Sequence, residues 1–242
     1  MVGRDPPAPF AADLLLTVAG DVDDPVAGPE ELPPTIRVFP LGGAILLPRA
    51  TLPLNIFEPR YLAMVRDAMA GDRLISIAQP RGDGSDERPG LYEVAGLGRI
   101  TQFSETGDGR YLIALSGLTR VRIVEELPVT TPYRQVRADY APFLADWHEP
   151  AALPEVMRAD LESVLQRYLD AQGLSADWEA VKAADDESLI NTLAAVCPFE
   201  ASERQALLEA PDLAQRTRTL TALMRFAADA TGVMGDGDTT VQ

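Results

Sequence analysis

Lysine, histidine and cysteine each occur once in the 242-residue chain, as Lys182, His148 and Cys197. A lysine can complete a phosphate-binding loop or activate a serine, a histidine can act as a general base, and a cysteine can act as a nucleophile. Ala183 follows Lys182 and no glycine pattern precedes it, so the sequence excludes a P-loop. Neighbouring acids such as Glu179 favour a charged lysine, which cannot serve as a general base. We therefore predict neither an ATPase nor a Ser–Lys hydrolase.

One histidine and one cysteine are too few ligands for a typical zinc site. His148 lies where strand-like and helix-like patterns meet, and we expect a linker or interface residue. Cys197 ends an apolar helical stripe before Pro198, as a buried small side chain does. A lone cysteine also permits no intramolecular disulfide, which favours a cytoplasmic protein. We predict no catalytic residue, no cofactor and no metal.

These residues lie in a chain whose apolar residues follow two different spacings, one typical of strands and the other of helices. Residues 36–143 have the pattern of short strands, with an Asp108-Gly109 hairpin signal and one helix between Pro59 and Gly71. The expected strands are residues 36–39, 44–47, 73–79, 91–104, 110–116, 119–123 and 134–140, with a loop at 80–90. Many short strands joined by tight turns predict a compact barrel.

After residue 143 the apolar spacing becomes helical. The expected helix starts are Pro154, Asp185 or Asp186, Ser202 with a capping box to Gln205, and Pro211. The predicted fold class is α+β. The expected parts are an acidic, proline-rich extension at 1–35, a barrel at 36–145, a helical bundle at 146–231 and a flexible tail at 232–242.

The net charge of −16 is unevenly distributed. Residues 36–143 balance at +1, whereas residues 1–35 carry −6 and residues 144–242 carry −11. Such acidic surfaces repel nucleic acid and anionic membranes. Since no apolar run approaches the roughly 20 residues that span a bilayer, we expect no membrane association. The sequence does not indicate an oligomeric state.

The most specific motif lies between Val38 and Tyr61. Its parts are Val-Phe-Pro-Leu at 38–41, Leu-Pro at 47–48 and Leu-Pro-Leu-Asn-Ile-Phe-Glu-Pro-Arg-Tyr at 52–61. These segments resemble the opening of the Lon protease N-terminal domain family. Residues 91–100, 107–109, 117–121 and 203–209, and then Arg216, resemble its later segments. The resemblance covers residues 38–226.

This resemblance implies a PUA-like β-barrel with one inserted helix, followed by a helical bundle. It also implies a non-catalytic module that recognises unfolded or hydrophobic polypeptide segments or a protein partner, as an adaptor in protein quality control. We expect a stand-alone member that lacks the family's ATPase and peptidase domains.

Two sets of residues follow from the resemblance. Apolar residues proposed to line a peptide groove between barrel and bundle are Leu54, Phe57, Tyr61, Phe103 and Tyr111. Motif residues expected to be structural are Pro40, Pro53, Glu58, Arg60, Gly117, Arg120 and Gln205. Among them, Glu58, Arg60 and Arg120 are expected to form an ion pair that holds the helix to the barrel.

RNA binding is the alternative, because PUA-like barrels often bind RNA. The arginines that would line one sheet face are Arg110, Arg120, Arg122, Arg134 and Arg137. The near-neutral charge of residues 36–143 argues against it, since phosphate binding needs a markedly basic surface.

Overall fold

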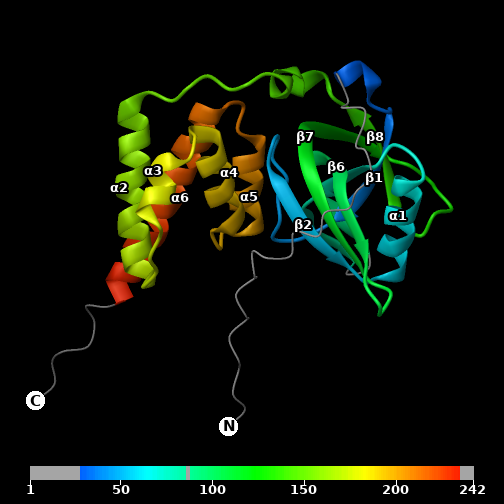
Figure 1. The fold of residues 1–242 in the computed structure, drawn as a ribbon, viewed down its shortest axis with the longest axis horizontal. Coiled ribbons are helices and arrows are strands. Elements are labelled where there is room, and N and C mark those ends of the chain that lie inside the picture. The colour runs from blue at the N-terminus through cyan, green and yellow to red at the C-terminus, as the bar shows by residue number, and fades with distance from the viewer. Residues whose placement is uncertain (1–27, 86–87, 235–242) are drawn as a thin grey trace, which may run out of the picture.

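Six strands form one mixed sheet that closes into a barrel (Figure 1). The computed structural model describes residues 28–85 and 88–234. The strands are β1 (Thr35–Pro40), β2 (Thr51–Ile56), β3 (Leu74–Ala78), β6 (Val94–Glu105), β7 (Tyr111–Glu126) and β8 (Arg134–Asp139). Their order is β2-β7-β6-β3-β1-β8, and β7 also pairs with β8. The long strand β7 closes the ring because its last part pairs with β8, while its first part pairs with the edge strand β2.

The strands differ from those predicted from the sequence at several places. The segments 110–116 and 119–123 are one continuous strand, β7. The expected loop at 80–90 is largely a hairpin of β4 (Pro80–Ser85) and β5 (Arg88–Leu91). Residues 51–56 form β2 although they contain Pro53, because β2 lies at an edge of the sheet order and pairs only with β7.

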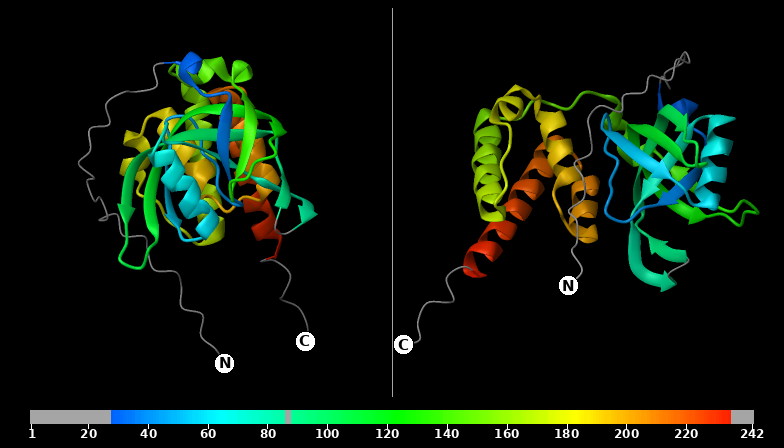
Figure 2. Two further views of the ribbon diagram at one scale, coloured as in Figure 1. Left: turned by 90° about the vertical axis from the view of Figure 1, so that its right-hand side faces the viewer. Right: turned by 60° about the horizontal axis from the view of Figure 1, so that its bottom comes forward.

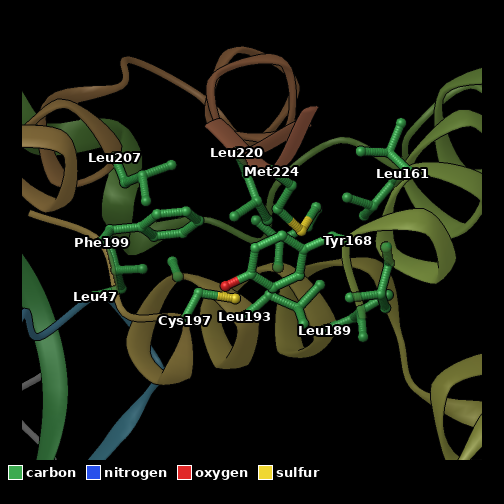
Figure 3. Packing of buried hydrophobic residues seen from close by; sticks show 14 of the residues in the cluster. Leu47, Leu161, Tyr168, Leu189, Leu193, Cys197, Phe199, Leu207, Leu220 and Met224 are labelled. Atoms are coloured by element: carbon green, nitrogen blue, oxygen red, sulfur yellow. The ribbon is translucent and has the colours of Figure 1, made fainter. Parts of the chain in front are cut away.

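Residues 44–47 are not a strand but a buried crossing segment. A Cβ atom on Gly96 would lie 1.9 Å from the carbonyl oxygen of Leu46, and one on Gly117 would lie 2.0 Å from that of Leu47. Only glycine therefore permits this close approach to β6 and β7. Leu46 packs into the core of the barrel, whereas Leu47 packs among the helices (Figure 3). Burial between two regions, rather than strand pairing, explains this apolar run.

The helix α1 (Pro59–Met69) packs on the barrel. Alternate residues of β3 face two different apolar clusters, with Ile75 and Ile77 under α1 and Leu74 and Ala78 on the opposite face. All of β3 is consequently buried.

Five helices make up the helical region: α2 (Glu155–Gln172), α3 (Trp178–Ala183), α4 (Asp186–Val196), α5 (Ala201–Glu209) and α6 (Leu213–Met234). Gly173 ends α2 with φ of +66°, and the Asp185 side chain caps α4 through the amide of Ser188. The capping box of α5 uses Glu200 and Glu203 instead of the expected Ser202 and Gln205. The apolar core that these helices share is shown in Figure 3.

The helical region lies beside the barrel, and an extended linker after the short helix η2 (Ala141–Trp147) joins them (Figures 1 and 2). A second short helix, η1 (Pro29–Glu31), precedes β1. The expected extension lies mostly outside the described residues. The expected tail begins inside α6, which continues to Met234, and residues 235–242 lie outside the described range.

Candidate functional site

The aromatic residues proposed for peptide contact do not share one exposed surface. Phe57 is 63% exposed, whereas Tyr61 and Tyr111 are only 5% and 8% exposed. Leu54 and Phe103 are half-buried beside the same core. The ring centroids of Tyr61 and Phe39 lie 4.1 Å apart, and those of Tyr111 and Phe103 lie 5.0 Å apart. Tyr61 and Tyr111, which were expected to line a peptide groove between barrel and bundle, instead pack into the barrel core.

A small pocket lies against Tyr61, and we call it the proline pocket. Its volume is about 150 Å³ and its walls are Pro40, Arg60, Tyr61, Pro80, Pro89, Pro132, Tyr133 and Arg134. These residues come from the ends of β1, α1 and β8 and from the β4–β5 hairpin. Proline rings provide apolar walls without backbone N–H donors. The hairpin, which the sequence predicted as a loop, thus supplies two of the four prolines.

Polar groups frame the proline pocket. The Arg60 guanidinium lies 4.6 Å from the centroid of the Tyr61 ring and 2.9 Å from a carboxylate oxygen of Glu58. Arg134 donates hydrogen bonds to Glu126 at 2.6 Å and to the carbonyl of Pro89 at 2.8 Å. Burial raises the pKa of Tyr61 above the ordinary value of a tyrosine phenol. The pocket thus combines an apolar interior with two cationic groups at its walls.

Arg120 connects the barrel to the helices and not to Glu58. Its Nη2 and Nε lie 2.7 and 3.0 Å from the two carboxylate oxygens of Asp146, and both residues are buried. Its Nη1 donates to the carbonyl oxygens of Leu208 and Ala210, at the end of α5. The expected ion pair among Glu58, Arg60 and Arg120 is therefore wrong as regards Arg120, whereas Glu58 does pair with Arg60.

Other polar side chains make the same kind of contact across the interface. Gln205 donates to the carbonyl of Val94 at 2.9 Å, Gln79 to that of Ala201 at 2.9 Å, and Asn191 to that of Pro48 at 3.2 Å. Sequence reasoning missed Asp146, Gln79 and Asn191. The only signal was their polarity next to apolar runs, which does not identify a partner 26 residues away for Asp146 or more than 100 residues away for Gln79 and Asn191.

The cavity between barrel and helical region has both apolar and charged walls, and none of the five residues expected to line a peptide groove belongs to it. This interface pocket has a volume of about 400 Å³. Its lining includes Arg49, Asp146, His148, Glu187 and Arg216. Arg49 makes two hydrogen bonds of 2.7 Å to the carboxylate of Glu187.

The arginines proposed for RNA contact are all paired with carboxylates. The pairs are Arg110–Asp108, Arg120–Asp146, Arg122–Asp139, Arg134–Glu126 and Arg137–Glu125. Paired arginines contribute little net positive field, so the barrel lacks the basic surface that RNA binding requires.

Lys182 and Ser163 line one shallow hollow between α2 and α3, but no hydrogen bond joins them within the described ranges. No group of three or more potential metal ligands was found in residues 28–85 and 88–234. No helix in that part of the chain is both long and apolar enough to cross a bilayer.

Comparison with known proteins identifies the fold. The N-terminal domain of a Lon protease from the Mycobacterium avium complex aligns with a TM-score of 0.57 at 18% identity, and covers 78% of this chain and 97% of that one. A Lon N-terminal domain protein from Xanthomonas campestris aligns with a TM-score of 0.54 at 24% identity, with the same two coverages.

Among curated relatives, Lon protease 2 of Myxococcus xanthus is 25% identical over 201 residues, which are 81% of this chain and 24% of that protein. Lon protease of Syntrophus aciditrophicus is 26% identical and covers 80% of this chain. The chain thus spans about a quarter of the length of the relatives it matches. Residues 35–225 match the family described as the ATP-dependent protease La (LON) substrate-binding domain, so the chain belongs to that family.

Proposed function

We propose that this chain binds unfolded or hydrophobic polypeptide segments by placing one apolar side chain in the proline pocket, beside the exposed Phe57. The observation that carries the proposal is the 63% exposure of this phenylalanine, three residues before Arg60 of the pocket wall. Large exposed apolar side chains next to a pocket are typical of interaction sites. Membership of a substrate-binding domain family supports a polypeptide as the ligand.

The dimensions of the proline pocket favour a single side chain as its occupant. Its volume of about 150 Å³ is below the range of about 300–1,000 Å³ in which drug-sized ligands bind. An engineered cavity of about 150 Å³ accepts a benzene molecule. A phenylalanine or leucine side chain of an unfolded segment therefore has a suitable size.

The polar groups of the pocket suit a peptide backbone. Arg60 and Arg134 are donors only, and peptide carbonyl groups are acceptors. Both arginines already interact with carboxylates, so they add hydrogen-bond donors without a large net charge. We expect weak binding with a modest dependence on salt, because an unfolded segment loses conformational entropy when it binds and apolar burial supplies most of the affinity.

The proposed binding involves no chemistry by this chain, and its role is that of a non-catalytic adaptor in cytoplasmic protein quality control. The residues that line the proline pocket include no histidine, cysteine, serine or lysine.

Fluorescence anisotropy with labelled hydrophobic peptides tests the proposal. Phe57→Ala should weaken binding by about fivefold or more, the effect of about 1 kcal/mol at an interface anchor. Phe226→Ala is the matched control, because Phe226 is 73% exposed on α6 in the other region. Equal effects of the two substitutions, or no binding at high micromolar protein, would contradict the proposal. A mobility shift with RNA at low salt should be negative, and a clear micromolar shift would favour RNA binding instead.

A further inference from the structure

Arg216 of α6 is a buried guanidinium without a carboxylate partner. The residue is 4% exposed, and its Nε donates to the carbonyl of Leu207 at 3.1 Å. Its Nη1 lies 3.4 Å from the side-chain oxygen of Asn191, and no carboxylate in the described ranges forms an ion pair with it. Burial, and then the charge of Arg120, lowers the pKa of Arg216 to about 10. Buried charges normally have a counterion, so this one is unusual.

The unused donors of Arg216 open into the interface pocket. Its Nη2 donates no hydrogen bond to any described residue. No nitrogen of Arg216 is among the fully buried atoms that lack a partner, so Nη2 has accessible surface. Because Arg216 lines the interface pocket, we take the accessible surface of Nη2 to face that pocket. A guanidinium with a free edge in a pocket can bind an oxyanion through directed hydrogen bonds.

The charges around the interface pocket select a singly charged ligand. Arg49 is paired with Glu187 at 2.7 Å and Arg120 with Asp146 at 2.7 Å, so these two pairs are neutral. Among the three arginines of the lining, only Arg216 has no paired carboxylate. Two further acids of the lining, Glu149 and Asp212, are exposed. They are screened by solvent but still oppose a second negative charge, as on phosphate.

The remaining walls have room for the end of a polypeptide chain. They consist largely of small or rigid apolar residues, namely Pro48, Ala145, Pro150, Ala151, Ala152, Pro211 and Ala214. The last residue of a chain presents a singly charged carboxylate next to its own side chain. A chain end only has to enter the pocket, whereas an internal segment has to enter and leave it. The volume of about 400 Å³ lies within the range of small-ligand sites.

We infer that the interface pocket binds the C-terminal carboxylate of a polypeptide, with Arg216 as its charged partner. The identity of the ligand as a polypeptide rests on the proposed function, but the site is distinct from Phe57 and the proline pocket. A segment bound there would be recognised by its free chain end rather than by its hydrophobicity.

The test uses NMR titration of the full chain with acetylated trialanine, which has no large apolar side chain. The peptide with a free C-terminal carboxylate should shift the amide signals of Ala151, Ala152 and Ala214. The C-terminally amidated peptide should bind about tenfold or more weakly, since hydrogen bonds to a charged group account for at least that factor. Equal binding of the two peptides overturns the inference. Equal shifts by inorganic phosphate overturn the assignment to a single charge, and equal shifts by an amidated peptide with an internal aspartate overturn the assignment to a chain end.

Two variants probe the charge. Arg216→Gln should abolish the preference for the free carboxylate. Glu187→Gln keeps hydrogen-bonding capacity for Arg49 but removes the opposing negative charge, so it should tighten carboxylate binding severalfold; unchanged or weaker binding contradicts the inference. Phe57→Ala should leave the trialanine titration unchanged, because that residue belongs to the other site. Failure of hydrophobic peptides to bind would thus refute the proposed function. The trialanine titration would still decide whether the interface pocket binds a C-terminal carboxylate.

Discussion

Replacing Arg120 with methionine removes the positive partner of a buried carboxylate. Arg120 and Asp146 are 3% and 6% exposed. After the substitution, Asp146 keeps the backbone amide of residue 120 at 2.8 Å and the hydroxyl of Thr119 at 3.5 Å as donors. Breaking a buried pair in this way costs about 3–5 kcal/mol. The carbonyls of Leu208 and Ala210 also lose a donor, which places the expected loss in the upper part of that range.

The loss should appear as a lower melting temperature and a lower denaturant midpoint. For a chain of this size, 1 kcal/mol corresponds to about 2–4 °C, so a loss of about 4–5 kcal/mol should lower the melting temperature by about 8–20 °C. The double variant Arg120→Met with Asp146→Leu should regain part of the loss, because no unpaired charge remains buried. Arg137→Met is a matched control on the same barrel, since the Arg137–Glu125 pair is exposed and worth about 1 kcal/mol or less.

Circular dichroism during urea unfolding, together with scanning calorimetry, measures these differences. A loss below about 1 kcal/mol for Arg120→Met would refute the reasoning, because it would mean that the carboxylate is solvated or re-paired. A double variant less stable than the single one would also contradict it. Arg120 joins the barrel to the end of α5, so its loss should also separate the unfolding of the two regions.

Two further predictions concern packing and pH. Gly117→Ala should destabilise the protein by about 1–3 kcal/mol in urea unfolding, because its Cβ would lie 2.0 Å from a carbonyl oxygen. Gly107→Ala is the control, because a Cβ atom at this position meets nothing within 4 Å, and it should change stability by less than about 0.5 kcal/mol. Burial raises the pKa of Cys197 from 9.0 to about 11, so at pH 8 a thiol reagent should label the native protein about a hundredfold more slowly than the unfolded chain. The raised pKa stabilises the fold below pH 9, and this contribution is lost as the pH rises towards 11. The free energy of unfolding of Cys197→Ala should therefore fall less between pH 9 and 11 than that of the unsubstituted protein. Equal declines would contradict the assignment.

Local signals predicted much of the secondary structure from the sequence. Pro59 begins α1, Gly173 ends α2 in a left-handed conformation, and Asp185 caps α4. These features depend on residues within one turn of each other, so the sequence pattern contains them. The α+β class and the family resemblance were confirmed for the same reason, since the motif at 38–61 is contiguous.

Features that depend on distant residues were not predictable. The run at 44–47 has the apolar character of a strand, but Ile45 and Leu47 are buried by helices more than 100 residues later. The partner of Arg120 is 26 residues away, and its other acceptors are about 90 residues away. Tyr61 and Tyr111 lie in or near strand-like motifs, and nothing in their spacing distinguishes a core ring from a binding ring. Exposure at Phe57 likewise follows from its place in the turn before α1.

The barrel and the helices meet through directed polar contacts as well as through apolar packing. Arg120 binds carbonyl oxygens at the end of α5, while Gln205 binds a carbonyl of the barrel. A buried donor that loses its acceptor costs about 1–3 kcal/mol, so sliding one region over the other would break several such contacts at once. The interface therefore fixes one relative orientation. Arg216 lies beside these contacts, donates to the carbonyl of Leu207 and lines the interface pocket.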